Sequence, residues 1–263
     1  MGKSKDLATG ETRFVNTAGD SMTGALTVSE VNNTSSLVSA RYNNSNRKIG
    51  FNANNSNGQG FLAFNSNSVS GSANQTYDTN GVAAKIDYTG AMTFDLAASG
   101  TAGNTITYSE KMRISSDGHV TTPNQPSFWV QATTNTGDYQ SGPIVFSSSN
   151  SNVTTSSLIS NGGTHFNTTN GRFTAPVAGL YQFNTQVRID SFGGSYSYAS
   201  IWDSGTNVIG RDLTSINTTY YTHTISATRY LSANDYVYVT LVSGGDSSVS
   251  VSSDSWFSGF LIG

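Results

Sequence analysis

Apolar and polar residues alternate along a strand-length segment in the second half of the chain. The apolar positions on one side of an extended backbone are Tyr181, Phe183, Val187 and Ile189, and the polar positions on the other side are Gln182, Asn184, Gln186 and Arg188. A period of two is typical of a β-strand with one face in a core and the other in solvent. The pattern therefore predicts a half-buried strand over residues 179–190.

A second segment, close to the C-terminal end, is apolar on both sides. Val237, Val239 and Leu241 occupy one face of the expected strand, while Tyr236 and Tyr238 occupy the other. Tyrosine combines a large apolar ring with a polar tip, and aromatic residues are enriched in protein interfaces. We therefore expect the tyrosine face to form a subunit interface or a ligand surface.

The same half of the chain contains further strand-length segments that are rich in aromatic and β-branched residues. The expected strands are Phe128–Ala132, Pro143–Ser147, Gly171–Thr174, Gly179–Asp190, Tyr196–Trp202, Tyr220–Leu231, Asp235–Ser243 and Ser255–Ile262. About eight strands at hairpin spacings predict a closed sandwich or jelly roll.

The first half has shorter expected strands, separated by clusters of Asn, Gly and Ser. The alternation over Val82–Leu96, interrupted by Thr89 and Gly90, predicts a hairpin, and Asp117 with Gly118 predicts another turn. Because the apolar faces are narrow, a single chain would bury little surface there. Lateral association of several chains into a shaft would supply the missing face, and a small independent sheet domain with loose loops is the alternative.

A boundary between the halves is expected at Thr121–Pro126, because two of the four prolines stand there and neither neighbouring strand could run through them. The sequence thus predicts an all-β chain in three parts: an N-terminal segment over residues 1–30, a β-rich shaft over 31–123 and a jelly-roll head over 124–263.

Composition agrees with this fold class and excludes several kinds of partner. Charged residues make up only 11% of the chain, and the many Ser, Thr, Asn and Gly residues disfavour long surface helices. The formal net charge is −3 and no basic stripe is present, so nucleic acid is not expected as a partner. The chain has no cysteine, which excludes disulfides and thiolate metal sites.

No apolar run reaches the roughly 18 residues that span a bilayer, so no membrane insertion is expected. The first ten residues also lack the apolar segment of a secretion signal. We therefore expect a protein that is made and kept in a cytoplasm until it is released.

Five blocks of the second half carry a resemblance to a known family. They are GPIVF (Gly142–Phe146), LISNGGTHFN (Leu158–Asn167), GRFTAPVAGLYQF (Gly171–Phe183), LSANDYVYV (Leu231–Val239) and WFSGFLIG (Trp256–Gly263). In order and spacing they resemble the globular head of complement component one q. The resemblance implies a ten-stranded jelly roll, shared with tumour necrosis factor, that packs three subunits about an axis.

By this resemblance, Phe173, Gly179, Tyr181, Phe183, Asp235, Val237, Phe257, Gly259 and Leu261 stand at positions that build the core or the trimer. Together with neighbouring aromatic residues, the core or trimer candidates are Phe173, Tyr181, Phe183, Tyr236, Tyr238, Trp256, Phe257 and Phe260. The chain departs from the family at Ala233 and Asn234, where a glycine usually precedes the aspartate. No calcium ligand is carried over.

Two short motifs of the first half carry a second resemblance. GDSMTGALTV (Gly19–Val28) is similar to a motif that opens many fibre shafts of phage tails, and EKMRISSDGHV (Glu110–Val120) is similar to a segment near their distal ends. Fibres of this kind are usually trimers, which agrees with the trimer that the head resemblance implies.

Residues with catalytic or metal-binding chemistry are sparse. His119, His165 and His223 are not spaced as metal ligands, and His223 shares a strand face with Tyr221 and Ile225, which favours a packed histidine. No glutamate follows Glu110, so glycosidase chemistry in the head would require aspartates, most of which flank turn-forming residues. No serine stands in a nucleophile-elbow pattern. Neither a metal, a cofactor nor an enzymatic activity is expected.

Aromatic side chains supply the candidates for binding. Aromatic rings stack on sugar faces, and their polar tips bond to hydroxyl groups. The receptor-binding candidates are Tyr196, Tyr198, Trp202, Tyr220 and Tyr221. Core or trimer-seam positions remain the alternative for the same residues.

These expectations combine into one functional hypothesis. A homotrimeric phage fibre docks on another virion protein through residues 1–30, and its head attaches to a glycan or protein of the host cell surface without catalysis. Three identical weak sites can raise overall binding by orders of magnitude. The first alternative is a structural fibre that decorates the capsid or tail without a specific receptor, and the second is a polysaccharide-cleaving spike.

Overall fold

The computed structural model describes residues 38–41, 48–54, 59–68, 75–88, 90–132, 136–137, 142–146, 165–215, 218–246 and 249–263. These residues contain strands and irregular segments but no helix, and so no helix that could cross a membrane. The chain divides into two compact units between Thr121 and Thr122. The expected N-terminal segment, residues 1–30, lies outside the described residues.

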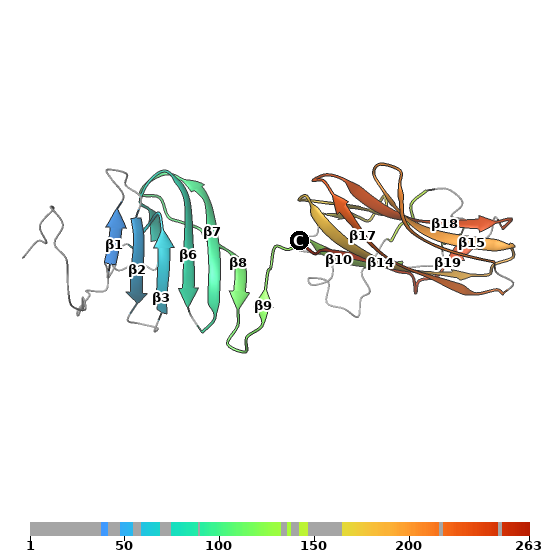
Figure 1. Cartoon of the computed structure of the whole chain (residues 1–263), viewed down its shortest axis with the longest axis horizontal. Helices are drawn as coiled ribbons and strands as arrows, with labels where there is room; N and C mark the ends of the chain where they lie inside the picture. The colour runs from blue at the N-terminus through green and yellow to red at the C-terminus, as the bar shows by residue number, and fades with distance from the viewer. Residues whose placement is uncertain are drawn as a thin grey trace, which may run out of the picture. The chain divides into compact units, whose positions relative to one another are not determined.

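The first unit contains one antiparallel sheet of seven strands (Figure 1). In spatial order the strands are β1 (Val38–Arg41), β2 (Lys48–Asn54), β3 (Gln59–Phe64), β6 (Gly81–Tyr88), β7 (Met92–Gly100), β8 (Ser109–Ile114) and β9 (Val120–Thr121). The insertion between β3 and β6 forms a separate short pair, β4 (Ser66–Ser68) with β5 (Gln75–Tyr77).

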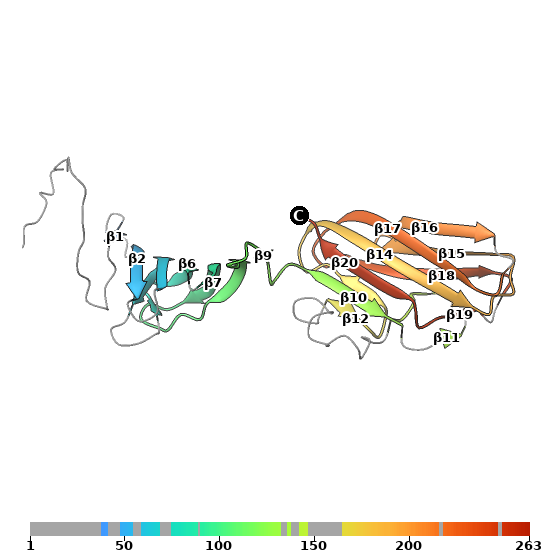
Figure 2. The ribbon, with the colours of Figure 1, turned by 90° about the horizontal axis from the view of Figure 1, so that it is seen from below.

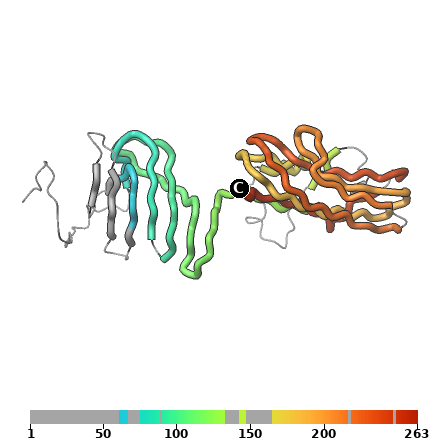
Figure 3. The backbone as a smooth tube through the Cα atoms, in the orientation of Figure 1, coloured from blue at the N-terminus to red at the C-terminus, as the bar shows by residue number. Residues whose placement is uncertain are grey.

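Both turns predicted for this half are confirmed. Strands β6 and β7 pair with Tyr88 opposite Met92, and Gly90 between them has a φ of +87°, which glycine adopts at little steric cost. Strands β8 and β9 form the second hairpin, drawn in green in Figure 3. Gly118 in its turn has a φ of +82°, and its N–H donates to the Ser115 carbonyl at 2.9 Å.

The two faces of the first unit's sheet are covered unequally. One face carries a small core in which Tyr77, Ala83, Ala97 and Ile106 are buried. On the other face, Ile86 lies opposite Phe94 and Tyr88 lies opposite Met92, and the sequence continues this apolar surface onto β8. Tyr88 and Met92 are exposed there. The small core agrees with the narrow apolar faces expected from the sequence.

The second unit is a sandwich of two antiparallel sheets, as the jelly-roll prediction required. The first, here called the β14 sheet, contains β10 (Ser127–Gln131), β20 (Trp256–Leu261), β14 (Gly179–Asp190) and β17 (Tyr221–Leu231), with the short strands β19 (Ser250–Val251) and β11 (Thr136–Gly137) beyond. The second, the β18 sheet, contains β12 (Phe166–Asn167), β13 (Arg172–Thr174), β18 (Tyr236–Gly244), β15 (Tyr196–Asp203) and β16 (Val208–Ser215). Figure 2 shows the long strands β14 and β17 side by side.

Aromatic rings fill the space between these two sheets. The Phe128 ring lies 4.6 Å from that of Phe173 and 4.9 Å from that of Phe257, measured between centroids. Glycine at position 259 makes room for this packing, since a Cβ atom there would stand 2.6 Å from a ring atom of Phe183. The alternation predicted for residues 179–190 is confirmed, because every second residue of β14 is buried.

The strands of the head differ from the predicted ones at several places, and the short strands β11, β12 and β19 were not expected. Strand β16 was not expected, because only one of its apolar residues alternates clearly with polar ones. In the structure, none of its residues is fully buried. Residues 143–146 of the expected strand Pro143–Ser147 have irregular backbone, although the N–H of Ile144 donates to the Val239 carbonyl at 2.7 Å.

The turn without the family's glycine keeps a left-handed residue. Asn234 has a φ of +74°, a conformation that asparagine tolerates better than most residues. Its N–H donates to the Ala175 carbonyl at 2.8 Å, and the carboxylate of Asp235 accepts from the N–H of Ser232. Asparagine therefore fills the place of glycine in the turn before β18.

Candidate functional site

The outward face of the β18 sheet carries a band of aromatic side chains, here called the aromatic strip: Tyr196, Tyr198, Trp202, Tyr236 and Tyr238. Trp202 on β15 lies directly opposite Tyr238 on β18. The rings of Tyr236 and Tyr238 are 6.1 Å apart, and those of Tyr196 and Tyr198 are stacked at 6.5 Å. Register thus gathers residues from two strands that are more than 30 positions apart in sequence.

Two arginines lie over the rings of this strip. The guanidinium carbon of Arg172, on β13, is 4.3 Å from the ring centroid of Tyr236 and 5.7 Å from that of Tyr238. The corresponding carbon of Arg211, on β16, is 4.5 Å from the Tyr198 centroid. A cation over an aromatic face is stabilised by the ring quadrupole, by about 0.5–1 kcal/mol when exposed. The strip therefore has cationic as well as apolar character.

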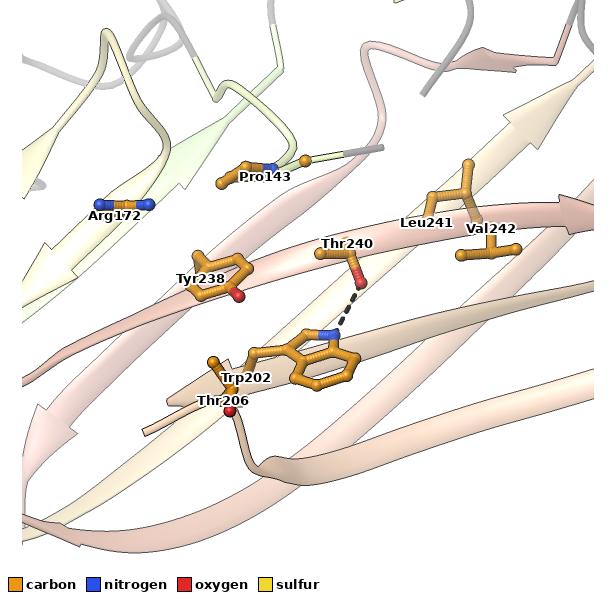
Figure 4. A pocket seen from close by; sticks show the side chains of 9 residues that line it. Pro143, Arg172, Trp202, Thr206, Tyr238, Thr240, Leu241 and Val242 are labelled. Carbon is orange, nitrogen blue, oxygen red and sulfur yellow. Dashed lines mark hydrogen bonds between the residues drawn. The ribbon is translucent and has the colours of Figure 1, made fainter. Parts of the chain in front are cut away.

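An open pocket of about 270 Å³ lies along the strip (Figure 4). Its lining includes Pro143, Arg172, Trp202, Thr206, Tyr238 and Thr240. Figure 4 shows Tyr238 between Arg172 and Trp202. The indole Nε1–H of Trp202 donates to the Thr240 hydroxyl oxygen at 3.0 Å, which fixes the orientation of the indole ring.

The outward face of the β14 sheet is apolar at one end. Leu180 and Tyr230 are cross-strand partners, and Phe260 of β20 lies opposite Gln182 of the same central strand. These three apolar side chains are exposed, Tyr230 to 64% and Phe260 to 46%, and Ile262 beside them is exposed too. Side chains of this size are costly to leave in water. This cluster of Leu180, Tyr230, Phe260 and Ile262 is called the apolar end of the β14 sheet.

A serine, a histidine and an aspartate meet between β15, β16 and β17. The Ser197 hydroxyl is 2.6 Å from Nε2 of His223, and Nδ1 of His223 is 3.1 Å from a carboxylate oxygen of Asp212. With Nδ1–H donating to Asp212, Nε2 accepts a hydrogen bond from the Ser197 hydroxyl. These contacts have the connectivity of a Ser–His–Asp catalytic triad.

The location of this cluster argues against catalysis. Ser197 and His223 have no exposed surface, so a substrate carbonyl has no route to the serine oxygen. Burial lowers the pKa of His223 below its usual value, while the hydrogen bond and charge of Asp212 oppose that shift. The Tyr221 ring covers the imidazole at 4.8 Å. The cluster acts as a buried polar clamp between three strands.

The candidates predicted from sequence fall into separate places. Tyr196, Tyr198 and Trp202 lie together on the aromatic strip, and Tyr236 and Tyr238, expected at a core, interface or ligand surface, lie beside them. Tyr220 is exposed at the start of β17, and Tyr221 faces His223 inside the sandwich. Phe173, Tyr181, Phe183 and Phe257 are fully buried, whereas Trp256 and Phe260 point outward from β20.

Sequence reasoning missed Arg172, Arg211 and the Ser197–His223–Asp212 clamp. Each belongs to its site only through cross-strand register, which local alternation does not specify. Within the described residues, no group of three or more His, Asp or Glu side chains is placed to hold a metal ion.

Comparisons with known proteins concern the second unit. Residues 127–262 match the family model of the C1q domain. Among solved structures, the chain is similar to the globular domain of zebrafish complement 1qA protein, with 18% identity over 53% of this chain and 98% of that chain and a TM-score of 0.37. It is also similar to Eiger TNF from S. frugiperda, with 13% identity over 53% of this chain and 94% of that chain and a TM-score of 0.43. A comparison with curated proteins gave no match.

Proposed function

The chain belongs to the C1q domain family, and from this premise we propose that it is a homotrimeric, non-enzymatic virion fibre that attaches to a host cell surface. The observation that carries the proposal is the aromatic strip with its two arginines and open pocket. A half-exposed array of aromatic rings and cations is suited to bind a ligand. The serine and histidine that could act in catalysis are buried, so the surface favours binding over catalysis.

Two exposed apolar surfaces support the homotrimer. The apolar end of the β14 sheet exposes Tyr230 and Phe260, and the first unit's sheet exposes Tyr88, Met92 and Leu96. Burial of such side chains contributes about 25 cal/mol per Å² of apolar area removed from water. C1q domains commonly form homotrimers, so a copy of the same chain is the occupant that fits both surfaces.

The virion location rests on the resemblance of two N-terminal motifs to phage fibre shafts. The second motif, Glu110–Val120, contains the hairpin of β8 and β9 immediately before the head. A fibre of this kind is made in the cytoplasm of an infected cell and docks on another virion protein through its N-terminal segment. A shaft that ends in a binding head suits attachment at a distance from the particle.

The proposed mechanism is adhesion through three equivalent sites. The rings of the aromatic strip stack on the apolar faces of sugars or on exposed protein side chains of the host surface. Each contact is weak by itself, but linkage of three heads in one trimer raises the effective concentration of the second and third sites. No bond is made or broken in this mechanism.

The test measures binding of the fluorescently labelled full chain to susceptible and resistant bacterial cells. We expect binding to susceptible cells and competition with infection, and Trp202→Ala is expected to reduce cell binding roughly tenfold or more, as for a central aromatic contact. Tyr220→Ala is the matched control, because Tyr220 is an exposed aromatic residue outside the strip. A chain that ignores susceptible cells would instead favour a decorative fibre without a receptor.

A further inference from the structure

We propose that the pocket of the aromatic strip receives a single sugar unit that carries an acidic group, either a carboxylate or a phosphate. The inference rests on the proposed attachment function and names the class of ligand for its central contact. The pocket offers one arginine, Arg172, and the aromatic rings of Trp202 and Tyr238 beside it.

Arg172 brings a positive charge that the described part of the chain leaves uncompensated. Its guanidinium lies over two tyrosine rings and lines the pocket, and no ion pair to it is formed by any described carboxylate. Its Nε–H is shielded from solvent and has no hydrogen-bond acceptor among the described residues. An unpaired, partly desolvated guanidinium is unfavourable by itself and favours an anionic ligand.

The other arginines of the head have partners, which sets Arg172 apart. Arg188 pairs with Asp190 and Asp254, and Arg229 pairs with Asp203. Arg211 also stacks on the strip, but its Nε–H donates to the Ser200 hydroxyl at 2.8 Å. The planar fork of a guanidinium matches a carboxylate or phosphate group in two parallel hydrogen bonds. Arg172 is therefore the residue available to recognise an acid.

The remainder of the pocket suits a sugar ring. Trp202 and Tyr238 stand as cross-strand neighbours, and the hydrogen bond from the Trp202 indole to Thr240 holds the larger ring in place before a ligand arrives. Thr206 adds a hydroxyl group to the lining. At about 270 Å³ the pocket lies near the lower end of ligand-site volumes, which suits one sugar unit of a longer glycan.

A nucleic acid fits this site less well than an acidic glycan. Binding to a phosphate backbone needs several cations along a groove, whereas this pocket contains one arginine and the chain has a net charge of −3. An acidic sugar unit can bind the one guanidinium through its acid group and can stack its apolar face on the two aromatic rings. This match of charge and shape is the reason for the choice of ligand.

The test uses an array of purified bacterial polysaccharides in three groups: neutral, carboxylate-bearing and phosphate-bearing. The full chain and its Arg172→Gln and Arg188→Gln variants are applied, and Arg188 is the control because it lies outside the strip on β14 and pairs with Asp190 and Asp254. We expect the full chain to bind acidic polysaccharides, with Arg172→Gln weakening that binding roughly tenfold or more and Arg188→Gln changing it less than about twofold. Binding within the carboxylate-bearing or the phosphate-bearing group identifies which acid the site takes.

Three results would overturn the inference: binding confined to neutral polysaccharides, equal binding by the wild-type chain and Arg172→Gln, or no binding to the array by a chain that still binds susceptible cells. The last result separates the two proposals, since attachment would stand while the acidic sugar would fall. A chain that binds neither cells nor polysaccharides would contradict the attachment function itself. Thermal unfolding of each variant confirms that it is folded.

Discussion

Trp202 and Tyr238 lie opposite each other on the adjacent strands β15 and β18, with both side chains on the outward face of the β18 sheet. The indole of Trp202 is tied by its Nε1–H to Thr240, two residues along the partner strand. Side chains directly opposite each other on one face of a sheet are close enough to interact. The pair stands within the aromatic strip, and the indole hydrogen bond orients its larger ring.

Removal of the indole hydrogen bond is expected to weaken attachment even though an aromatic ring stays at position 202. Trp202→Phe and Thr240→Val each delete one partner of the 3.0 Å contact, so each should weaken cell binding by about 0.5–1.5 kcal/mol. Because both changes remove the same interaction, the double variant should be far from additive. Thr240→Ser keeps a hydroxyl group and is the control. Additive losses in cell-binding titrations would show that the contact does not orient Trp202.

The buried His223 should make the head less stable in acid. Its folded pKa is lowered from the ordinary 6.5, chiefly by burial, so the unfolded chain takes up a proton more readily than the folded chain. The groups that face it are Asp212, Ser197 and Tyr221, and Asp212 reduces the shift. The contribution of neutral His223 to the free energy of unfolding is therefore fully present above the pKa of the unfolded chain's histidine. It is lost as the pH falls from there through the folded pKa.

The pH effect is measured by thermal unfolding of the wild-type chain and His223→Gln between about pH 5 and pH 8. The wild type should lose melting temperature with acid in this window more steeply than the variant. A constant difference between the two curves would mean that His223 does not titrate on unfolding.

The left-handed turn at Asn234 offers a test of backbone strain. Asn234→Gly should stabilise the head or leave it unchanged, and Asn234→Ala should destabilise it by roughly 1 kcal/mol, because a φ of +74° is unfavourable for a residue with a Cβ atom. Ala233→Gly, at a residue without positive φ, serves as the control and should not stabilise. Chemical denaturation measures all three. A loss of stability in Asn234→Gly would indicate that the asparagine side chain matters more than its backbone.

The aromatic core should reject a side chain at position 259. A Cβ atom there would stand 2.6 Å from Phe183 and 2.7 Å from Phe128, so Gly259→Ala is expected to destabilise the head by about 1–3 kcal/mol. At Gly193 the nearest atom to an added Cβ is 3.6 Å away, and Gly193→Ala should be nearly neutral. Equal unfolding free energies for the two variants would contradict the core packing described for the sandwich.

Local sequence patterns predicted where strands lie better than they predicted which strands pair with each other. The alternation in β14 and the two-sided apolar character of β18 could be read directly, because side-chain period follows from extended geometry. Strand β16 was not predicted, because a half-exposed strand at the edge of a sheet needs few apolar residues and so leaves little alternation in the sequence. Gly90, and Gly118 after Asp117, marked the two predicted hairpin turns of the first unit for the same local reasons.

The candidate site was predicted only in part. Tyr196, Tyr198 and Trp202 could be named as receptor-binding candidates, with core or trimer-seam positions as the alternative. Their place beside Tyr236 and Tyr238 depends on the register between β15 and β18. Arg172 joins them from a three-residue strand that has no pattern of its own. His223 was expected to be packed, yet its link to Ser197 and Asp212 bridges strands that a single sequence does not align.

Self-association into a trimer underlies the proposed attachment, and light scattering of the full chain measures it directly. The chain has a mass of 27.8 kDa, and we predict a particle of three times that mass. The double variant Tyr230→Asp/Phe260→Asp places two negative charges in the apolar end of the β14 sheet. It should weaken the trimer, because burial of unpaired carboxylates is costly. Leu213→Asp, at an equally exposed apolar residue on β16, should leave it intact. A wild-type chain that stays at the mass of one copy would contradict the trimeric fibre and the multivalent attachment built on it.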